Sequence, residues 1–472
     1  MVFNKKLSFE DKELAILREA VDKAQKKIKR QNIMSPMHRE IVEQVEHFLR
    51  SKKCICYGGT AINNILPIND QFYDKTLEMP DYDFYSDNAL NLAKQLADIY
   101  AKKGFSDVQA KAGMHHGTYK VFVNYIPVAD ITHMDKKLFN LLKKDSIKVN
   151  GILYAPPDFL RMSMYLELSR PKGDVSRWEK VQKRLVLLNK NYPIKNIRCN
   201  YERFQRGFET HSVKKKDEKT IYDVVKNSFI NQGLIFFGGY ANDLFSRYMP
   251  TKERKILADI PDFDVLSEDP KTSAVILIEQ LEYHGFKKVK YLKHPGVGEI
   301  IAPHYEIRIG KETIAFIYKP LACHSFNIIN IKGVLIKVAS IDTMLSFYLA
   351  FMYADRIYYD KDRILCMCQY LFNVQEKNRL KQKGLLKRFS TKCYGEQESI
   401  NSIREKKSVM YQKLKNKRNS KEYESWFLKY SPSEKNTLKI NKKTKTKKNK
   451  KTKTKKNKKI KTKTKKIKKT NL

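Results

Sequence analysis

The order of apolar and polar positions along the chain predicts alternating strands and helices. Short apolar runs at 54–57 and 82–85 are typical of buried strands, and 89–102 has apolar residues at helical spacing. A hairpin is expected over 120–131. Ahead of these elements, residues 1–52 have the pattern of two helices. The pattern therefore predicts a mixed α+β fold, within the broad α/β class, that is preceded in the chain by an N-terminal helical segment.

The same order of elements recurs about 180 residues later in the chain. Each hairpin is also followed by an apolar helix, expected at 158–166 in the first half and at 342–349 in the second. A repeat of this length indicates a duplicated domain and not a solenoid. In the second half we expect strands at 234–237 and 263–266, a helix over 273–284 and a hairpin over 306–318.

Two short motifs stand at the same place in both halves. Tyr57-Gly58-Gly59-Thr60 precedes Asp81-Tyr82-Asp83, and Phe237-Gly238-Gly239-Tyr240 precedes Asp262-Phe263-Asp264. From the second glycine to the first aspartate the spacing is 22 residues in one copy and 23 in the other. This agreement makes two chance matches a poor explanation. Taken alone, a Gly-Gly pair usually marks a turn, and an Asp-x-Asp pair lies more often in a solvated loop than in a metal site.

The first copy has the groups that nucleotidyl transfer requires. Gly58 and Gly59 have no β-carbon, so their backbone amides can approach a triphosphate closely, and Thr60 can add a hydroxyl donor. Asp81 and Asp83 are two positions apart on an expected strand, so their side chains share one face and suit a pair of Mg²⁺ or Mn²⁺ ions. The first copy is therefore expected to be the catalytic module.

Asp130 is the candidate for the third carboxylate of a two-metal site. It lies in the apolar strand 125–131, where a buried carboxylate needs a cation partner. In the second copy Phe316 takes its place, and Tyr240 replaces Thr60. We expect the second copy to be catalytically silent, with a structural or RNA-binding role, and Asp262 and Asp264 to belong to a solvated loop or to be a relic of duplication.

A basic segment follows the first apolar helix. Lys172, Arg177 and Lys180 stand where the chain leaves the catalytic module, and they suit contacts to the triphosphate or to RNA phosphates. The alternative is an ordinary charged helix start, capped by Asp174 or Ser176. His115, His116 and His133 lack the spacing of a zinc site, so solvated or hydrogen-bonding roles are favoured.

Composition and charge indicate a class of binding partner and a cellular location. The seven cysteines and 42% apolar residues favour a globular body with reduced thiols, and no apolar run is long enough to cross a bilayer, so we expect an intracellular, soluble protein. Residues 435–472 hold 20 lysines and no acid; without them the net charge of +43 is still +23. Such charge favours nucleic acid as partner over an anionic membrane. We expect the lysine-rich tail to be disordered.

The expected organisation has five parts. These are a helical brace at 1–52, a catalytic nucleotidyltransferase domain at 53–190, a degenerate nucleotidyltransferase-like domain at 191–375, a polar helical region at 376–434 and the tail at 435–472.

The chain resembles the poly(A) polymerase catalytic subunits of large cytoplasmic DNA viruses, the group that includes the poxvirus enzyme. The similarity rests on residues 57–61, 80–86 and 168–174; the last segment is the most family-specific, and the others occur across polymerase-β-like nucleotidyltransferases. The resemblance implies a degenerate second domain, Asp81, Asp83 and Asp130 as metal ligands, and Gly58, Gly59 and Thr60 as triphosphate contacts. It also implies ATP as donor, an mRNA 3′ end as acceptor, and the host cytoplasm or the virion as location. Whether a processivity subunit or a homodimer is involved does not follow from the residues.

These observations favour template-independent addition of AMP to RNA 3′ ends. Another RNA terminal nucleotidyltransferase, uridylyl- or CCA-adding, or an oligoadenylate synthase, would share the same motifs. A non-catalytic RNA-binding scaffold is the alternative of a different class, and the intact set of residues in the first copy disfavours it.

Overall fold

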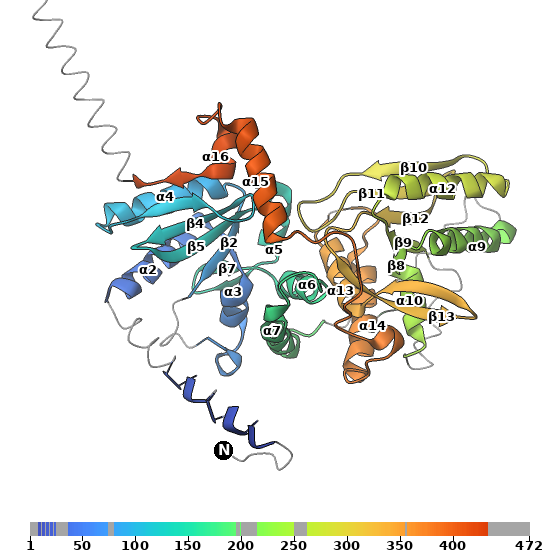
Figure 1. Cartoon of the computed structure of the whole chain (residues 1–472), viewed down its shortest axis with the longest axis horizontal. Helices are drawn as coiled ribbons and strands as arrows, with labels where there is room; N and C mark the ends of the chain where they lie inside the picture. The colour runs from blue at the N-terminus through green and yellow to red at the C-terminus, as the bar shows by residue number, and fades with distance from the viewer. Residues whose placement is uncertain are drawn as a thin grey trace, which may run out of the picture.

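Two mixed β-sheets of eight strands each, flanked by helices, form the body of the chain (Figure 1). The expected disordered tail lies outside the residues that the structure describes. Within the described ranges no helix has the length and apolar character that crossing a bilayer needs. The computed structural model describes residues 8–24 except 11, 15, 18 and 22, and then 36–73, 80–194, 199, 215–249, 262–354 and 356–432.

The first sheet has the strand order β16-β3-β4-β5-β2-β1-β7-β6. Helices α2 (Pro36–Lys52) and α4 (Ala89–Lys102) pack on it, because their buried apolar residues recur at helical spacing. The other helices of this half are α3 (Gly58–Ile65), α5 (Lys136–Lys144), α6 (Pro157–Leu168) and α7 (Trp178–Asn191), with short 3₁₀ turns η1 (Ile68–Asp70) and η2 (Val175–Arg177). The strands are β1 (Ile55–Tyr57), β2 (Tyr82–Ser86), β3 (Gln109–Ala112), β4 (Thr118–Val123), β5 (Ile126–His133), β6 (Ile147–Val149), β7 (Ile152–Tyr154) and β16 (Lys429–Tyr430).

The second sheet has the order β10-β11-β12-β9-β8-β14-β13-β15. Its helices are α9 (Lys215–Asn231), α10 (Gly238–Ser246), α12 (Pro270–Tyr283), α13 (Ile341–Phe351) and α14 (Lys361–Lys377). Its strands are β8 (Ile235–Phe237), β9 (Phe263–Leu266), β10 (Val289–His294), β11 (His304–Ile309), β12 (Glu312–Tyr318), β13 (His324–Ile331), β14 (Val334–Ala339) and β15 (Cys393–Tyr394).

The two sheets repeat one topology, which confirms the predicted duplication. The run β4-β5-β2-β1-β7-β6 of the first sheet recurs as β11-β12-β9-β8-β14-β13 in the second. In both, the strand before the glycine turn pairs antiparallel with the Asp-x-Asp strand, which pairs parallel with the far strand of the hairpin. We refer to the two halves as the first and second modules.

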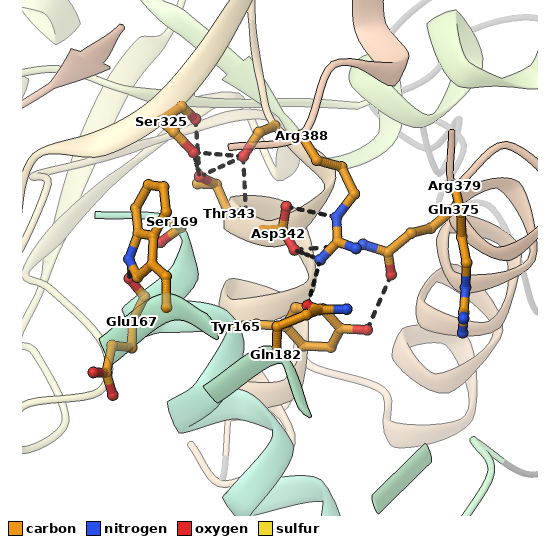
Figure 2. A network of polar contacts seen from close by, with 12 residues as sticks. Tyr165, Glu167, Ser169, Gln182, Ser325, Asp342, Thr343, Gln375, Arg379 and Arg388 are labelled. Atoms are coloured by element: carbon orange, nitrogen blue, oxygen red, sulfur yellow. Dashed lines mark hydrogen bonds and ion pairs between the residues drawn. The ribbon is translucent and has the colours of Figure 1, made fainter. Parts of the chain in front are cut away.

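The modules meet through equivalent helices, α6 of the first and α13 of the second. At one end of this junction the Ser325 amide donates to the Ser169 carbonyl over 2.8 Å. Deeper in, Arg388 donates to both oxygens of Asp342, at 2.6 and 3.2 Å, and reaches Gln182 of α7 (Figure 2). Asp342 is fully buried, so this ion pair lies where water does not reach, and the hydrogen bond from Arg388 to Gln182 links it to the first module.

The C-terminal region turns back to the first module. Helices α15 (Ile400–Leu414) and α16 (Lys421–Phe427) lead to β16, which adds an edge strand next to β3 (Figure 1). A 2.7 Å ion pair joins Lys94 to Glu424, and the rings of His116 and Trp426 stack 4.0 Å apart. The sequence predicted a polar helical region at 376–434, but not the return of this region to the first sheet.

The prediction that the cysteines are reduced thiols is wrong for four of them. Disulfides join Cys199 to Cys366 and Cys323 to Cys393, with Cα–Cα distances of 5.6 and 5.1 Å. The partners are 167 and 70 residues apart in the chain, so their proximity depends on the tertiary fold. The remaining cysteines are free and buried, as expected: Cys54, Cys56 and Cys368.

Candidate active site

The glycine turn of the first module lies directly against one of the predicted catalytic carboxylates. Strand β1 ends at Tyr57 and α3 begins at Gly58, whose φ of +73° is a conformation that favours glycine. A β-carbon added at Gly58 would stand 2.7 Å from Oδ2 of Asp83. Both the backbone angle and the close carboxylate therefore require glycine here. The arrangement brings the predicted phosphate-binding turn and the predicted metal ligand together.

The three aspartates converge from two neighbouring strands. Asp81 precedes β2, and Asp83 is its second residue, directly opposite Asp130 in the parallel pairing with β5. Tyr82, between the two aspartates, is buried on the core side and donates from its hydroxyl to Glu46. The predicted cation partner of Asp130 is Lys120 of β4, which forms an ion pair with it. The strand register thus places Asp83 beside Asp130.

The pKa values show how closely these negative charges are gathered. Burial, Asp81 and Asp130 together raise the pKa of Asp83 to about 7. Burial and Asp130 raise the pKa of Asp81 as well. Carboxylates that destabilise one another in a partly buried site suit divalent cations, which prefer oxygen ligands and would remove the repulsion. Among the described residues, however, no three His, Cys, Asp or Glu side chains stand ready to coordinate one ion, and Lys120 already pairs with Asp130.

Thr60 supports the site from behind the turn. Its side chain is buried, and its hydroxyl donates to the Asp81 carbonyl over 2.6 Å. In this arrangement Thr60 fixes the backbone from which Asp81 projects. A direct contact between this hydroxyl and a triphosphate stays a prediction.

The predicted cations of the basic segment differ in their distance from the carboxylates. Arg177 of η2 lowers the pKa of Asp83, and Lys180 of α7 lowers that of Asp81, so both lie within electrostatic reach. Arg177 also forms a 3.2 Å ion pair with Glu167. Lys172 is exposed on a turn and is not among the main charges that shift either pKa. The capping alternative is confirmed at Asp174, whose side chain accepts from the Ser176 amide and caps η2, and contacts of these cations to phosphates stay a prediction.

Arg184 of α7 is a candidate that sequence reasoning missed. A β-carbon at Gly59 would stand 2.8 Å from Nη1 of Arg184 and 2.5 Å from Oη of Tyr73, so the guanidinium lies against the second glycine of the turn. It donates to Tyr73 over 2.6 Å and lies 4.9 Å from the centre of the Phe72 ring. The segment that carries these rings is anchored to α3, where Asn63 accepts from both backbone amides at 2.8 Å.

The environment of Arg184 points to an anionic ligand. The side chain is only 8% exposed, and the acid on which its charge acts is Glu167, which already pairs with Arg177. A phosphate group held by the Gly58 and Gly59 amides would place a further negative charge directly against the guanidinium. In the sequence, Arg184 is one of many basic residues in a charged helix. Only its distance to Gly59 distinguishes it.

The second module keeps the turn but has a different arrangement of charge. Phe316 lies opposite Asp264, as Asp130 lies opposite Asp83, which confirms the predicted loss of the third carboxylate. A β-carbon at Gly239 would collide with the Asp262 side chain, and one at Gly238 with that of Asp264. Asp264 thus lies against the first glycine of the turn as Asp83 does, whereas Asp262 occupies the space over the second glycine, where the first module has Arg184.

Comparisons with known proteins agree with this geometry. Residues 43–174 match the family model described as "Poly(A) polymerase catalytic subunit". A protein of Acanthamoeba polyphaga mimivirus named "Putative poly(A) polymerase catalytic subunit" is 33% identical over 177 residues, which cover 36% of this chain and 30% of that protein. A protein of the same name from African swine fever virus (strain Badajoz 1971 Vero-adapted) is 34% identical over 159 residues, covering 32% and 33% of the two chains. The match thus spans about a third of the length of these relatives.

The fold has a solved counterpart that extends over both modules. The crystal structure of the Megavirus polyadenylate synthase superposes with a TM-score of 0.75, covering 92% of this chain and 88% of that one, at 20% sequence identity. The segment that matches the family model contains the glycine turn and all three aspartates. This segment is thus similar to the poly(A) polymerase catalytic subunits of large DNA viruses, and the chain shares the fold of the Megavirus polyadenylate synthase.

Proposed function

We propose that the protein is a template-independent poly(A) polymerase that transfers AMP from ATP to the 3′ end of RNA. The observation that carries this proposal is the position of Asp83, which lies against Gly58 and directly opposite Asp130. A triphosphate bound by the turn amides would have its α-phosphate next to these carboxylates. Sequence similarity over residues 43–174 supports the same reaction.

The chain's own groups divide into two sets in this reaction. Gly58, Gly59 and Arg184 hold the triphosphate, while Arg177 and Lys180 offset negative charge at the carboxylates. Asp81, Asp83 and Asp130 would hold Mg²⁺ or Mn²⁺, which supply charge stabilisation for the attacking and leaving oxygens. Because Lys120 pairs with Asp130, its ammonium has to move aside when that carboxylate binds an ion.

The transfer is an in-line substitution at phosphorus. The terminal 3′-hydroxyl oxygen of the RNA loses its proton and bonds to the α-phosphorus of ATP, while the bond from that phosphorus to the bridging oxygen breaks. The products are RNA longer by one AMP, pyrophosphate and the released proton. The strong positive charge of the chain favours binding of the RNA strand. An mRNA substrate and a processivity partner or homodimer are part of the proposal through family resemblance.

One experiment separates this proposal from its alternatives. Purified full-length protein is given a labelled single-stranded RNA, Mg²⁺ or Mn²⁺, and ATP, UTP, CTP or GTP one at a time. Long products with ATP alone, absent in Asp83→Asn, are expected. Extension with a different nucleotide would keep the site and change the substrate, whereas RNA binding with no extension by any nucleotide would favour the scaffold.

A further inference from the structure

A row of directly opposite residues crosses the first sheet from the predicted metal ligands to the C-terminal strand β16. The strand register pairs Asp83 with Asp130 and Asp130 with Lys120. It continues from Lys120 to Lys111 of β3, and from Lys111 to Lys429 of β16. Residues directly opposite one another in neighbouring strands share one face of the sheet. Three lysines, which we call the lysine row, therefore extend from the carboxylates across the same face.

This face of the sheet is open at the lysine row. Lys111 and Lys429 are exposed, and the Lys120 side chain is 40% exposed. Their strand neighbours Ala110 and Val121 are buried on the opposite face, where α4 packs. Neighbouring strands lie about 4.8 Å apart, so the row spans about 10 Å of open surface. An extended ligand can contact all three ammonium groups.

The lysine row places like charges directly opposite one another twice, which destabilises a sheet. Asp130 offsets the charge of Lys120, but neither Lys111 nor Lys429 forms an ion pair with a carboxylate of the described residues. Lysines on edge strands often keep other chains from pairing there, and this role accounts only for Lys429, because β3 and β4 are paired on both sides. The arrangement points to an anionic ligand.

An aromatic ring lies beside the lysine row. Phe122 follows Lys120 by two residues on β4, so it lies on the same face, and it is partly exposed. The ammonium of Lys111 lies 5.6 Å from the centre of this ring. Cations that follow a phosphate backbone, together with rings on which bases stack, are the combination by which proteins bind single-stranded nucleic acid.

The lysine row also lies on the side from which an acceptor strand has to come. The glycine turn follows β1, on one side of β2 and β5, whereas β4, β3 and β16 lie on the other side. In an in-line transfer the attacking hydroxyl approaches opposite the leaving pyrophosphate. With the triphosphate at the glycine turn, the acceptor approaches over the lysine row.

We propose that the lysine row binds the phosphate backbone of a single-stranded RNA acceptor next to its 3′ end. Lys120 contacts the phosphate nearest the 3′ end, and Lys111 and Lys429 contact the phosphates that precede it. Only the identification of this strand as the acceptor rests on the proposed function. The proposal gives the C-terminal region a role, because the return of β16 to the first sheet supplies the last lysine of the row.

The test measures RNA binding by the full-length protein without nucleotides or metal ions. Fluorescence anisotropy gives the Kd of a labelled 15-residue RNA for Lys111→Gln, Lys429→Gln and the double variant. At 0.1 M salt we expect each substitution to weaken binding about fivefold, and both together to reduce the log-log salt slope by about 1.4. Lys111→Arg keeps the charge and should bind like the native protein. Lys148→Gln, at an exposed lysine of β6 on the other edge of the same sheet, is the matched control and should change neither quantity.

A change on the ligand side locates these contacts along the RNA and separates them from contacts of the lysine-rich tail. One RNA carries neutral methylphosphonate linkages at its three 3′-terminal positions, and a second RNA carries them at its 5′ end. The double variant should bind the second RNA about 25-fold more weakly than the native protein does. It should bind the first RNA about as well as the native protein does, because the charges that the row contacts are already absent.

Three outcomes would overturn the proposal. These are equal losses for the two modified RNAs, no loss for the unmodified RNA, and an equal loss in Lys148→Gln. Loss of binding to phosphatidylserine vesicles with RNA binding intact would also overturn it, and would assign the row to an anionic membrane. Failure of the polymerase proposal would show separately: a loss specific to the 3′ end, with no nucleotide added in the extension assay, would keep the RNA site and exclude the reaction.

Discussion

Replacing Asp83 with asparagine should abolish extension and at the same time make the protein more stable above neutral pH. Burial, Asp81 and Asp130 raise the pKa of Asp83 from 3.8 to about 7. Between these values the folded protein keeps a proton that the unfolded chain has lost, so the free energy of unfolding falls as pH rises. At about 1.4 kcal/mol for each pH unit, the raised pKa costs the folded state about 4 kcal/mol at pH 8, where the carboxylate is charged, and about 2 kcal/mol at pH 5, where the folded state keeps the proton.

Thermal unfolding in the presence of a chelator measures this cost. Asp83→Asn should unfold at a higher temperature than the native protein. Its gain in the free energy of unfolding should be about 2 kcal/mol larger at pH 8 than at pH 5. Mg²⁺ should then stabilise the native protein at pH 8 and have little effect on the variant, because ions that bind only the folded state stabilise it. The matched control is Asp87→Asn, an exposed aspartate just after β2, for which no such gain is expected.

The reasoning would be refuted if Asp83→Asn were equally stable or less stable than the native protein at pH 8. In that case Asp83 would be held by favourable hydrogen bonds, and the carboxylates would not be under mutual repulsion. Loss of extension without any gain in stability would then indicate a general defect at β2 and would not identify a metal ligand.

Three further predictions concern other parts of the chain. Arg184→Gln should raise the KM for ATP about tenfold to a hundredfold and leave the Kd for RNA unchanged, since it removes a charged hydrogen bond to the triphosphate; steady-state kinetics and anisotropy test this. Asp342→Asn should lower the free energy of unfolding in urea by about 3–5 kcal/mol, because Arg388 would stay buried without its counterion, whereas Asp342→Leu combined with Arg388→Met should cost much less. Deleting 439–472 should weaken RNA binding and flatten its log-log salt dependence by about 0.7 for each lost phosphate contact; an unchanged slope would exclude the tail from the binding surface.

Local patterns were enough to predict most of the core of both modules. The helix expected over 89–102 has those bounds, and the strand expected at 82–85 is β2, because hydrophobic periodicity reports burial directly. Neighbours that are distant in the chain could not be predicted in this way. The pairing of β16 with β3 and the disulfide between Cys199 and Cys366 depend on how whole modules pack.

The same distinction holds for the candidate site: residues in recurring motifs could be predicted, and a residue placed by tertiary packing could not. The glycines and aspartates were identifiable because their types and spacing recur in the second copy, and the alignment of Phe316 with Asp130 followed from that repeat. Arg184 is not part of any recurring motif. Its position depends on the packing of α7 against the segment that carries Phe72 and Tyr73, and no short-range pattern encodes that packing.

The two modules show that a shared backbone does not determine which ligand a site takes. Both have a left-handed glycine after the first strand, with φ of +73° at Gly58 and +75° at Gly238, and both place an aspartate against it. At the next glycine the sign of the charge is reversed: the guanidinium of Arg184 lies against Gly59, and the carboxylate of Asp262 lies against Gly239. A phosphate is attracted to the first turn and repelled from the second. Restoring a third carboxylate at Phe316 would therefore not by itself give the second module a triphosphate site, because Asp262 would still occupy the place of the phosphate.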